Sequence, residues 1–188
     1  MLDFQPVREK KITLQDLVRN LTKADLQREL NEMYDEISRL ITDCKDADVT
    51  FEPVDEKAND LYSVQGEETI AWNLGHVIVH LTASMEEAAA IASELARGVK
   101  YHGRSRSEVP WRDATTIDFC RARLAESRRM CLASLEMWPN EPKMENTYAP
   151  SEGAVPHTAV SRFASGLRHA SDHLGQIAEI VHQAKRVL

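Results

Sequence analysis

The feature that most constrains the fold is a set of four long segments in which apolar residues recur every three or four positions. This spacing places the apolar side chains on one face of an α-helix. The segments span residues 22–44, 74–97, 115–137 and 158–187, and a short helical lead-in at 13–21 precedes them. No stretch shows the apolar and polar alternation that is typical of a strand. We therefore predict an all-α fold, an antiparallel four-helix bundle with long crossover loops.

The ends of these segments carry residues that start and stop helices. Thr22 and Thr115 each precede an aspartate by three positions, an arrangement that gives partners to the free backbone N–H groups of a first helical turn. Asn73 is a suitable cap for the second segment, and Gly98 is a suitable left-handed stop. The third segment is expected to end at Trp138, which a proline follows.

Length and composition favour one domain that covers residues 1–188. The chain is 43% hydrophobic with only seven glycines and seven prolines, which is typical of a compact core. Its 23 Lys and Arg against 30 Asp and Glu give a net charge of -7, which argues against a nucleic-acid or anionic-membrane partner. The three cysteines lack zinc-finger or redox spacing, and neither a signal peptide nor a membrane span is recognisable. We expect a cytoplasmic protein.

Histidines occur in two pairs with four-residue spacing, His76 with His80 and His169 with His173. On a helix such a pair lies on one face, about 6 Å apart along the axis, so both rings can reach one ion. His80 and His173 flank the apolar stripes of their helices, where a groove could hold the ion. A third imidazole from a neighbouring helix would complete a site with room for a substrate. The alternative is that these histidines are ordinary core or surface residues, and the spacing alone does not decide between the two.

Other metal and catalytic frameworks fit the sequence less well. A carboxylate-bridged di-iron bundle needs two Glu-x-x-His motifs, and the chain contains only Glu179-x-x-His182. There is no His-Glu-x-x-His motif, no Gly-x-Ser-x-Gly elbow and no glycine-rich phosphate loop. Three imidazoles with an open position are the best inorganic interpretation.

Two motifs occur in a characteristic order. Trp72 precedes His80 by eight positions, and a later segment reads His169-x-x-x-His173-x-Gly-Gln176. Together they resemble the DinB-like (DinB/YfiT) superfamily of metal-binding four-helix bundles, over residues 22–188. The resemblance implies that His80, His169 and His173 are the ligands of a divalent metal ion. Imidazole ligands suit Zn, Ni or Fe.

Two positions near these motifs need separate interpretation. His76 stands at the third helical position, where the family commonly has an acidic partner of the helix cap. It is a candidate for a cap partner, a base beside the metal or a fourth ligand, and we favour a role other than ligand because its helical angle lies further from the core than that of His80. Gln176 is a candidate to contact a ligand, and Asp172 is expected at the surface.

The resemblance implies several functions. Relatives include transferases that attach a low-molecular-weight thiol to electrophiles, thiol-dependent isomerases, and domains of sulfur-handling enzymes. These reactions share a need for a Lewis acid that lowers the pKa of a thiol or an oxygen. We therefore expect a metal-dependent enzyme acting on a small molecule, with a low-molecular-weight thiol as a candidate substrate. The alternatives are a non-catalytic bundle that binds a metal or a ligand, and a metal-free scaffold.

The long connection between the second and third segments is locally basic. Arg104, Arg106 and Arg112 lie in it, with Tyr101 and Trp111 interleaved. One interpretation is a loop that receives an anionic small molecule, such as a thiol that carries carboxylates. The other is a solvated crossover loop, as loops usually are.

Assembly into a homodimer is also expected, since members of the resembled family are often homodimers. The lead-in at 13–21 contains apolar residues that a single bundle is not expected to cover. These residues are Leu14, Leu17, Val18 and Leu21.

Overall fold

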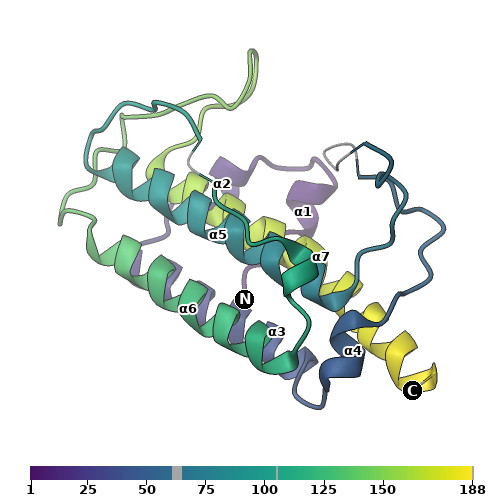
Figure 1. Ribbon diagram of the computed structural model, residues 1–188. Coiled ribbons are helices and arrows are strands. Elements are labelled where there is room, and N and C mark those ends of the chain that lie inside the picture. Colours follow the sequence, from purple (N-terminus) through teal and green to yellow (C-terminus); the bar gives the residue numbers. More distant parts are fainter. Residues whose placement is uncertain (61–64, 105, 188) are drawn as a thin grey trace.

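The computed structural model describes residues 1–60, 65–104 and 106–187 (Figure 1). These residues form helices and connecting loops with no β-strand, which confirms the all-α prediction. An isolated bridge joins Tyr148 and His157. The long helices are α3 (Lys23–Leu40), α5 (Leu74–Ala96), α6 (Ile117–Glu136) and α7 (Ala159–Val187); the short ones are α1 (Gln5–Arg8), α2 (Leu14–Val18), α4 (Asp46–Thr50) and the 3-10 helix η1 (Trp111–Asp113).

The four long helices share one core. Helix α5 packs against α6 and α7, and α3 packs against the same two helices (Figure 1). Helix α5 has buried residues on all its sides, because it is apolar almost throughout. The largest fully buried side chains in the core include Leu26, Leu30 and Ile37 of α3, Leu74, Ile78 and Leu81 of α5, and Phe163 of α7.

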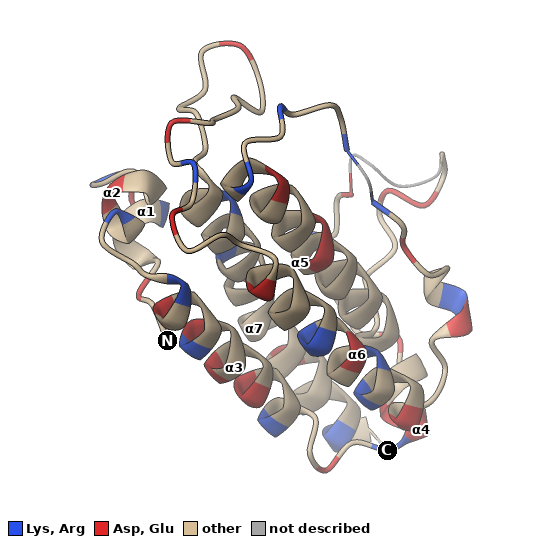
Figure 2. Ribbon diagram, turned by 90° about the vertical axis from the view of Figure 1, so that its left-hand side faces the viewer, with Lys and Arg blue, Asp and Glu red and all other residues tan. Residues whose placement is uncertain are grey.

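The outward faces of α3 and α6 are polar. Figure 2 shows Lys and Arg interspersed with Asp and Glu along α3 and α6. Among the described residues, none of the helices combines the length and the apolar character that crossing a membrane requires.

Most helix boundaries agree with the capping residues in the sequence. The Thr22 hydroxyl accepts a hydrogen bond from the Asp25 N–H, and the Asp25 carboxylate accepts one from the Thr22 N–H. The Asn73 side chain caps α5 by accepting from the His76 N–H. Gly98 follows α5 with a positive φ of 82°, as predicted for a left-handed stop.

Two predicted boundaries were wrong by one to four residues. The cap of α6 is Thr116 rather than Thr115, because it is the Thr116 side chain that accepts the free N–H of Phe119. Helix α3 ends at Leu40 rather than at Cys44. The chain turns there. The Cys44 N–H donates to the carbonyl of Ile41, three residues earlier, whereas in a continuing α-helix it would donate to the carbonyl four residues earlier. Cys44 remains buried after the turn.

The lead-in residues are covered by the chain itself, contrary to expectation. Helix α2 packs against α7, which buries Leu14 and Val18. Leu17 and Leu21 are partly buried against the same core. The exposed apolar surface that we expected here is therefore absent, and the homodimer stays a prediction that depends on the family resemblance alone.

Candidate metal centre

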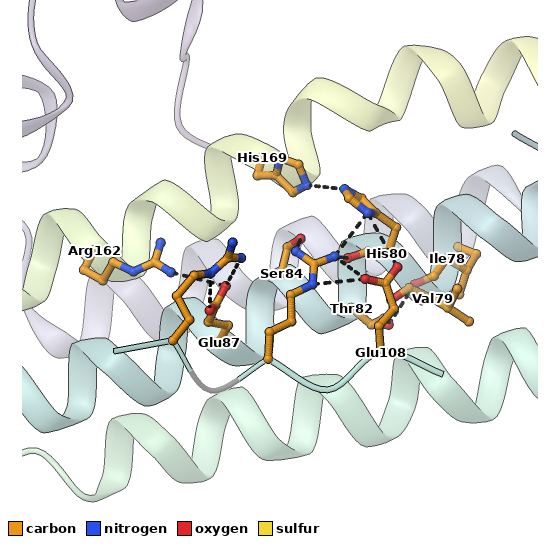
Figure 3. Close-up of polar contacts among 11 residues, drawn as sticks. Ile78, Val79, His80, Thr82, Ser84, Glu87, Glu108, Arg162 and His169 are labelled. Atoms are coloured by element: carbon orange, nitrogen blue, oxygen red, sulfur yellow. Dashed lines mark hydrogen bonds and ion pairs between the residues drawn. The ribbon is translucent and has the colours of Figure 1, made fainter. Parts of the chain in front are cut away.

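Three imidazoles meet between α5 and α7. His80 comes from α5, and His169 and His173 come from successive turns of α7. Each offers one ring nitrogen, and these three atoms lie within 4.8 Å of one another. The Nε2 atoms of His80 and His169 are 2.9 Å apart (Figure 3). The His173 ring is steeply inclined to the other two, at 74° to His80 and 83° to His169. Such a group can converge on one ion.

Close packing of the two helices brings these histidines together. Gly166 lies one turn before His169, and a Cβ atom added there would be 2.7 Å from the Cβ of Ala88. Only the absence of a side chain allows this approach, since real Cβ contacts are longer. His169 lies one turn from this contact and His80 about two turns from it, and their rings meet across the same helix interface.

Burial favours the neutral form of two of the candidate ligands, His169 and His173. Burial, together with the nearby His173 and His80, lowers the pKa of His169 to about 4. Burial also lowers the pKa of His173, although its hydrogen bond with Gln176 opposes the shift. Neutral imidazoles keep the lone pairs that a metal ion needs.

Gln176 contacts a candidate ligand, as the sequence analysis proposed. Its Oε1 lies 2.8 Å from Nδ1 of His173. Because a carbonyl oxygen only accepts, Nδ1 of His173 carries the proton, and Nε2 is left with the lone pair. Asp172, by contrast, is 41% exposed and pairs with Arg8 at 2.7 Å.

His76 stacks against tryptophans and lies outside the three-histidine group found among the described residues. Its ring is 4.2 Å from that of Trp72 and 5.0 Å from that of Trp111, with interplanar angles of 21° and 2°. Burial lowers its pKa to about 4, with a further contribution from His80. Its Nδ1 is buried and has no hydrogen-bond partner in the described part of the chain.

Gly75 explains how Trp111 reaches His76. The segment that follows η1 crosses the first turn of α5 so closely that a Cβ atom on Gly75 would collide with the carbonyl oxygen of Ala114. The missing side chain therefore lets η1 pack against α5. Trp111 is thereby placed over the ring of His76.

A cavity of about 720 Å³ opens onto the three histidines. Its size suits a small molecule. The sequence analysis did not predict that carboxylates line this cavity, since they come from loops whose path is set by tertiary packing. Besides the four histidines of the two pairs, the lining residues are Asp60, Glu67, Trp72, Arg104, Arg106, Glu108 and Trp111.

Each arginine of the basic loop has a carboxylate partner. Arg104 donates two hydrogen bonds to Glu87, at 2.8 and 2.7 Å, and the Glu87 side chain is only 4% exposed (Figure 3). Arg106 pairs with Glu108 at 2.5 Å. Arg104 and Arg106 line the cavity, so the loop does reach the site, but its positive charges are balanced by the protein.

Arg112 lies at the edge of this arrangement. It pairs with Glu67 at 2.7 Å, and its guanidinium carbon is 4.3 Å from the ring centre of Trp111. It is not one of the residues that line the cavity. Its contacts therefore support Trp111 rather than form the cavity wall.

A comparison with protein families matches the DinB superfamily to residues 13–177. The chain belongs to the DinB superfamily. The matched range includes His80, His169, His173 and Gln176, and it confirms the family resemblance of the two motifs. The DinB chain matches no curated protein and no solved structure.

Proposed function

We propose that this DinB-superfamily protein is an enzyme that depends on a divalent metal ion held by His80, His169 and His173. The observation that carries the proposal is the convergence of three imidazoles, with ring nitrogens within 4.8 Å of one another, on a cavity large enough for a substrate. We further propose that the four long helices form the antiparallel bundle of the family and that the protein is a cytoplasmic homodimer.

The donor set fits such an ion. Three uncharged nitrogen ligands are typical of catalytic sites that hold Zn, and imidazole suits Ni and Fe as well. Gln176 fixes the ring of His173 in the form that leaves Nε2 free. Three ligands leave a coordination position for a substrate, whereas a structural site is usually closed by a fourth.

The cavity walls suit reactions of a small molecule. A divalent ion in this site supplies a Lewis acid, which lowers the pKa of a thiol or of water. Trp72 and Trp111 give the cavity apolar surface that limits water near the histidines. We propose a thiol-dependent S-transferase or isomerase reaction, with a low-molecular-weight thiol as one substrate.

The metal is tested first. Protein purified without a nickel column should contain close to one divalent ion per chain by elemental analysis. His80→Ala, His169→Ala and His173→Ala should each lose it. Full metal content in all three variants would overturn the proposed ligand set.

The reaction is tested on protein whose metal content is known. Several cellular thiols are paired with a chlorinated or an epoxide electrophile, and product formation is compared with that of His80→Ala. We expect turnover that stops on chelation. Absence of turnover above His80→Ala with every thiol would contradict the transferase proposal and favour a non-catalytic metal-binding or ligand-binding bundle.

A further inference from the structure

The two ring nitrogens of His80 have different neighbours. Its Nε2 faces the other imidazoles, 2.9 Å from Nε2 of His169. Its Nδ1 faces the loop that follows α5, where Nη2 of Arg106 is 3.1 Å away and Oε1 of Glu108 is 3.6 Å away. Figure 3 shows Glu108 and His169 on different sides of the His80 ring.

These two neighbours of Nδ1 are not equivalent once Nε2 binds an ion. A neutral imidazole carries one proton, so Nδ1 must hold it when Nε2 gives its lone pair to a metal. A guanidinium has only donors and cannot accept that proton, whereas a carboxylate can. The contact between Arg106 and Nδ1 therefore requires the tautomer of His80 in which Nδ1 has no proton. Of the two neighbours, only Glu108 suits the tautomer in which Nε2 binds the metal.

Glu108 is held in place for this role by Arg106. The guanidinium donates to the same Oε2 atom of Glu108 from Nη2 at 2.5 Å and from Nε at 3.0 Å, which leaves Oε1 directed toward His80. Arg106 is itself fixed on α5 by a 2.9 Å hydrogen bond to the hydroxyl of Ser84. Two hydrogen bonds from the Arg106 guanidinium favour the charged form of the Glu108 carboxylate.

We propose that Glu108 is a positioning residue of the metal site, whose carboxylate accepts the Nδ1–H of His80 when Nε2 of His80 holds the ion. The inference rests on the proposed metal site and extends it to the loop. A carboxylate partner fixes the orientation of the ring and makes the imidazole a stronger ligand. Arg106 then keeps its contacts with Glu108 and Ser84 and loses its contact with Nδ1 of His80.

The first test measures the affinity for zinc, by competition with a chromophoric chelator. Glu108→Gln keeps the size of the side chain and removes its charge, and it should weaken binding by about 10- to 100-fold, as loss of such a partner does elsewhere. The matched control is Glu67→Gln, the same change in a carboxylate that lines the same cavity but pairs with Arg112. Glu67→Gln should weaken zinc binding by less than about threefold, since the Glu67 carboxylate contributes only a screened charge to the metal site. Equal effects of the two substitutions would overturn the proposal.

The second test is spectroscopic, and its decisive result comes from the wild-type protein. Zinc-loaded wild type, labelled with ¹⁵N-histidine, should show a slowly exchanging Nδ1–H proton on His80, shifted downfield by its carboxylate acceptor. Glu108→Ala, which removes the acceptor, should lose that protection. A zinc-loaded wild type whose His80 Nδ1 has no protected proton would also overturn the proposal.

The outcomes separate this inference from the function on which it rests. If zinc does not bind, or binds regardless of His169→Ala, the proposed metal site fails. If zinc binds through the three histidines but is insensitive to Glu108→Gln, only the role of Glu108 fails.

Discussion

Gly166 of α7 packs against Met85 of α5, and a Cβ atom added to Gly166 would lie 2.8 Å from the Met85 Sδ. This contact is one turn from His169 and little more than one turn from His80. The separation of α5 and α7 at the candidate metal centre is therefore set by the smallest side chain in the interface.

Gly166→Ala should separate the two helices. Overpacking of this kind costs about 1–3 kcal/mol, so urea unfolding should show a lower free energy of unfolding, and zinc titration should show weaker binding. Gly175→Ala, on the same helix, is the control, because apart from that helix's own backbone and the adjacent residues no described atom lies within 4 Å of the added Cβ atom. That variant should gain up to about 1 kcal/mol from helix propensity. Equal stabilities of the two variants would contradict the packing argument.

His76→Ala should keep the metal and lose stability. The substitution removes two stacked ring contacts, with Trp72 and Trp111, which together are worth about 1–3 kcal/mol. Elemental analysis and thermal unfolding measure the two effects separately. Loss of metal from His76→Ala, as from His80→Ala, would mean that His76 is a ligand after all.

The metal-free protein should lose stability in mild acid. The pKa of His76 and of His169 is about 4 in the folded chain, against 6.5 for an unperturbed histidine. Above pH 6.5 both residues are neutral in the folded and unfolded states and contribute no pH dependence. Between pH 6.5 and 4 the unfolded state binds protons that the folded state does not, so the free energy of unfolding falls as the pH falls. The slope corresponds to the uptake of up to about two protons on unfolding.

Urea titrations at a series of pH values measure this slope. The variant with both His76→Gln and His169→Gln should show a smaller slope than wild type over the same window. An unchanged slope would show that these two residues are not the source of the pH dependence.

Arg104→Gln should act on stability more than on substrate binding. The substitution leaves the buried carboxylate of Glu87 with Arg162, whose nearest nitrogen is 3.9 Å away. The cost should be about 1–3 kcal/mol, since Arg104 is itself 65% exposed and water can partly replace it. Arg112→Gln is the control, because its partner Glu67 is 27% exposed whereas Glu87 is only 4% exposed. A raised Michaelis constant for a thiol with unchanged stability would instead support the anion-binding interpretation of the loop.

Local signals explain what the sequence could predict. Thr22, Asn73 and Gly98 act within one helical turn, so their roles could be recognised without knowledge of the fold. His169 and His173 share a face of one helix for the same reason. The spacings alone left the role of these histidines open, the family resemblance implied a group of three, and the structure brings the three rings together.

The features that the sequence did not reveal depend on distant contacts. Leu14 is buried only because α2 docks on α7, far along the chain. Trp111 reaches His76 because Gly75 leaves room for the carbonyl of Ala114. Glu108 reaches His80 through the path of a loop that has no periodic pattern.

The division of the histidines between α5 and α7 has a consequence for biogenesis. His80 and His169 are 89 positions apart, so a nascent chain on the ribosome displays a single one of the three imidazoles until α7 has been synthesised. A lone imidazole cannot compete for an ion in the way that the closely spaced ligands of a zinc finger do. For the proposed site, metal acquisition should therefore follow folding instead of nucleating it, and the ion should bind the folded apoprotein.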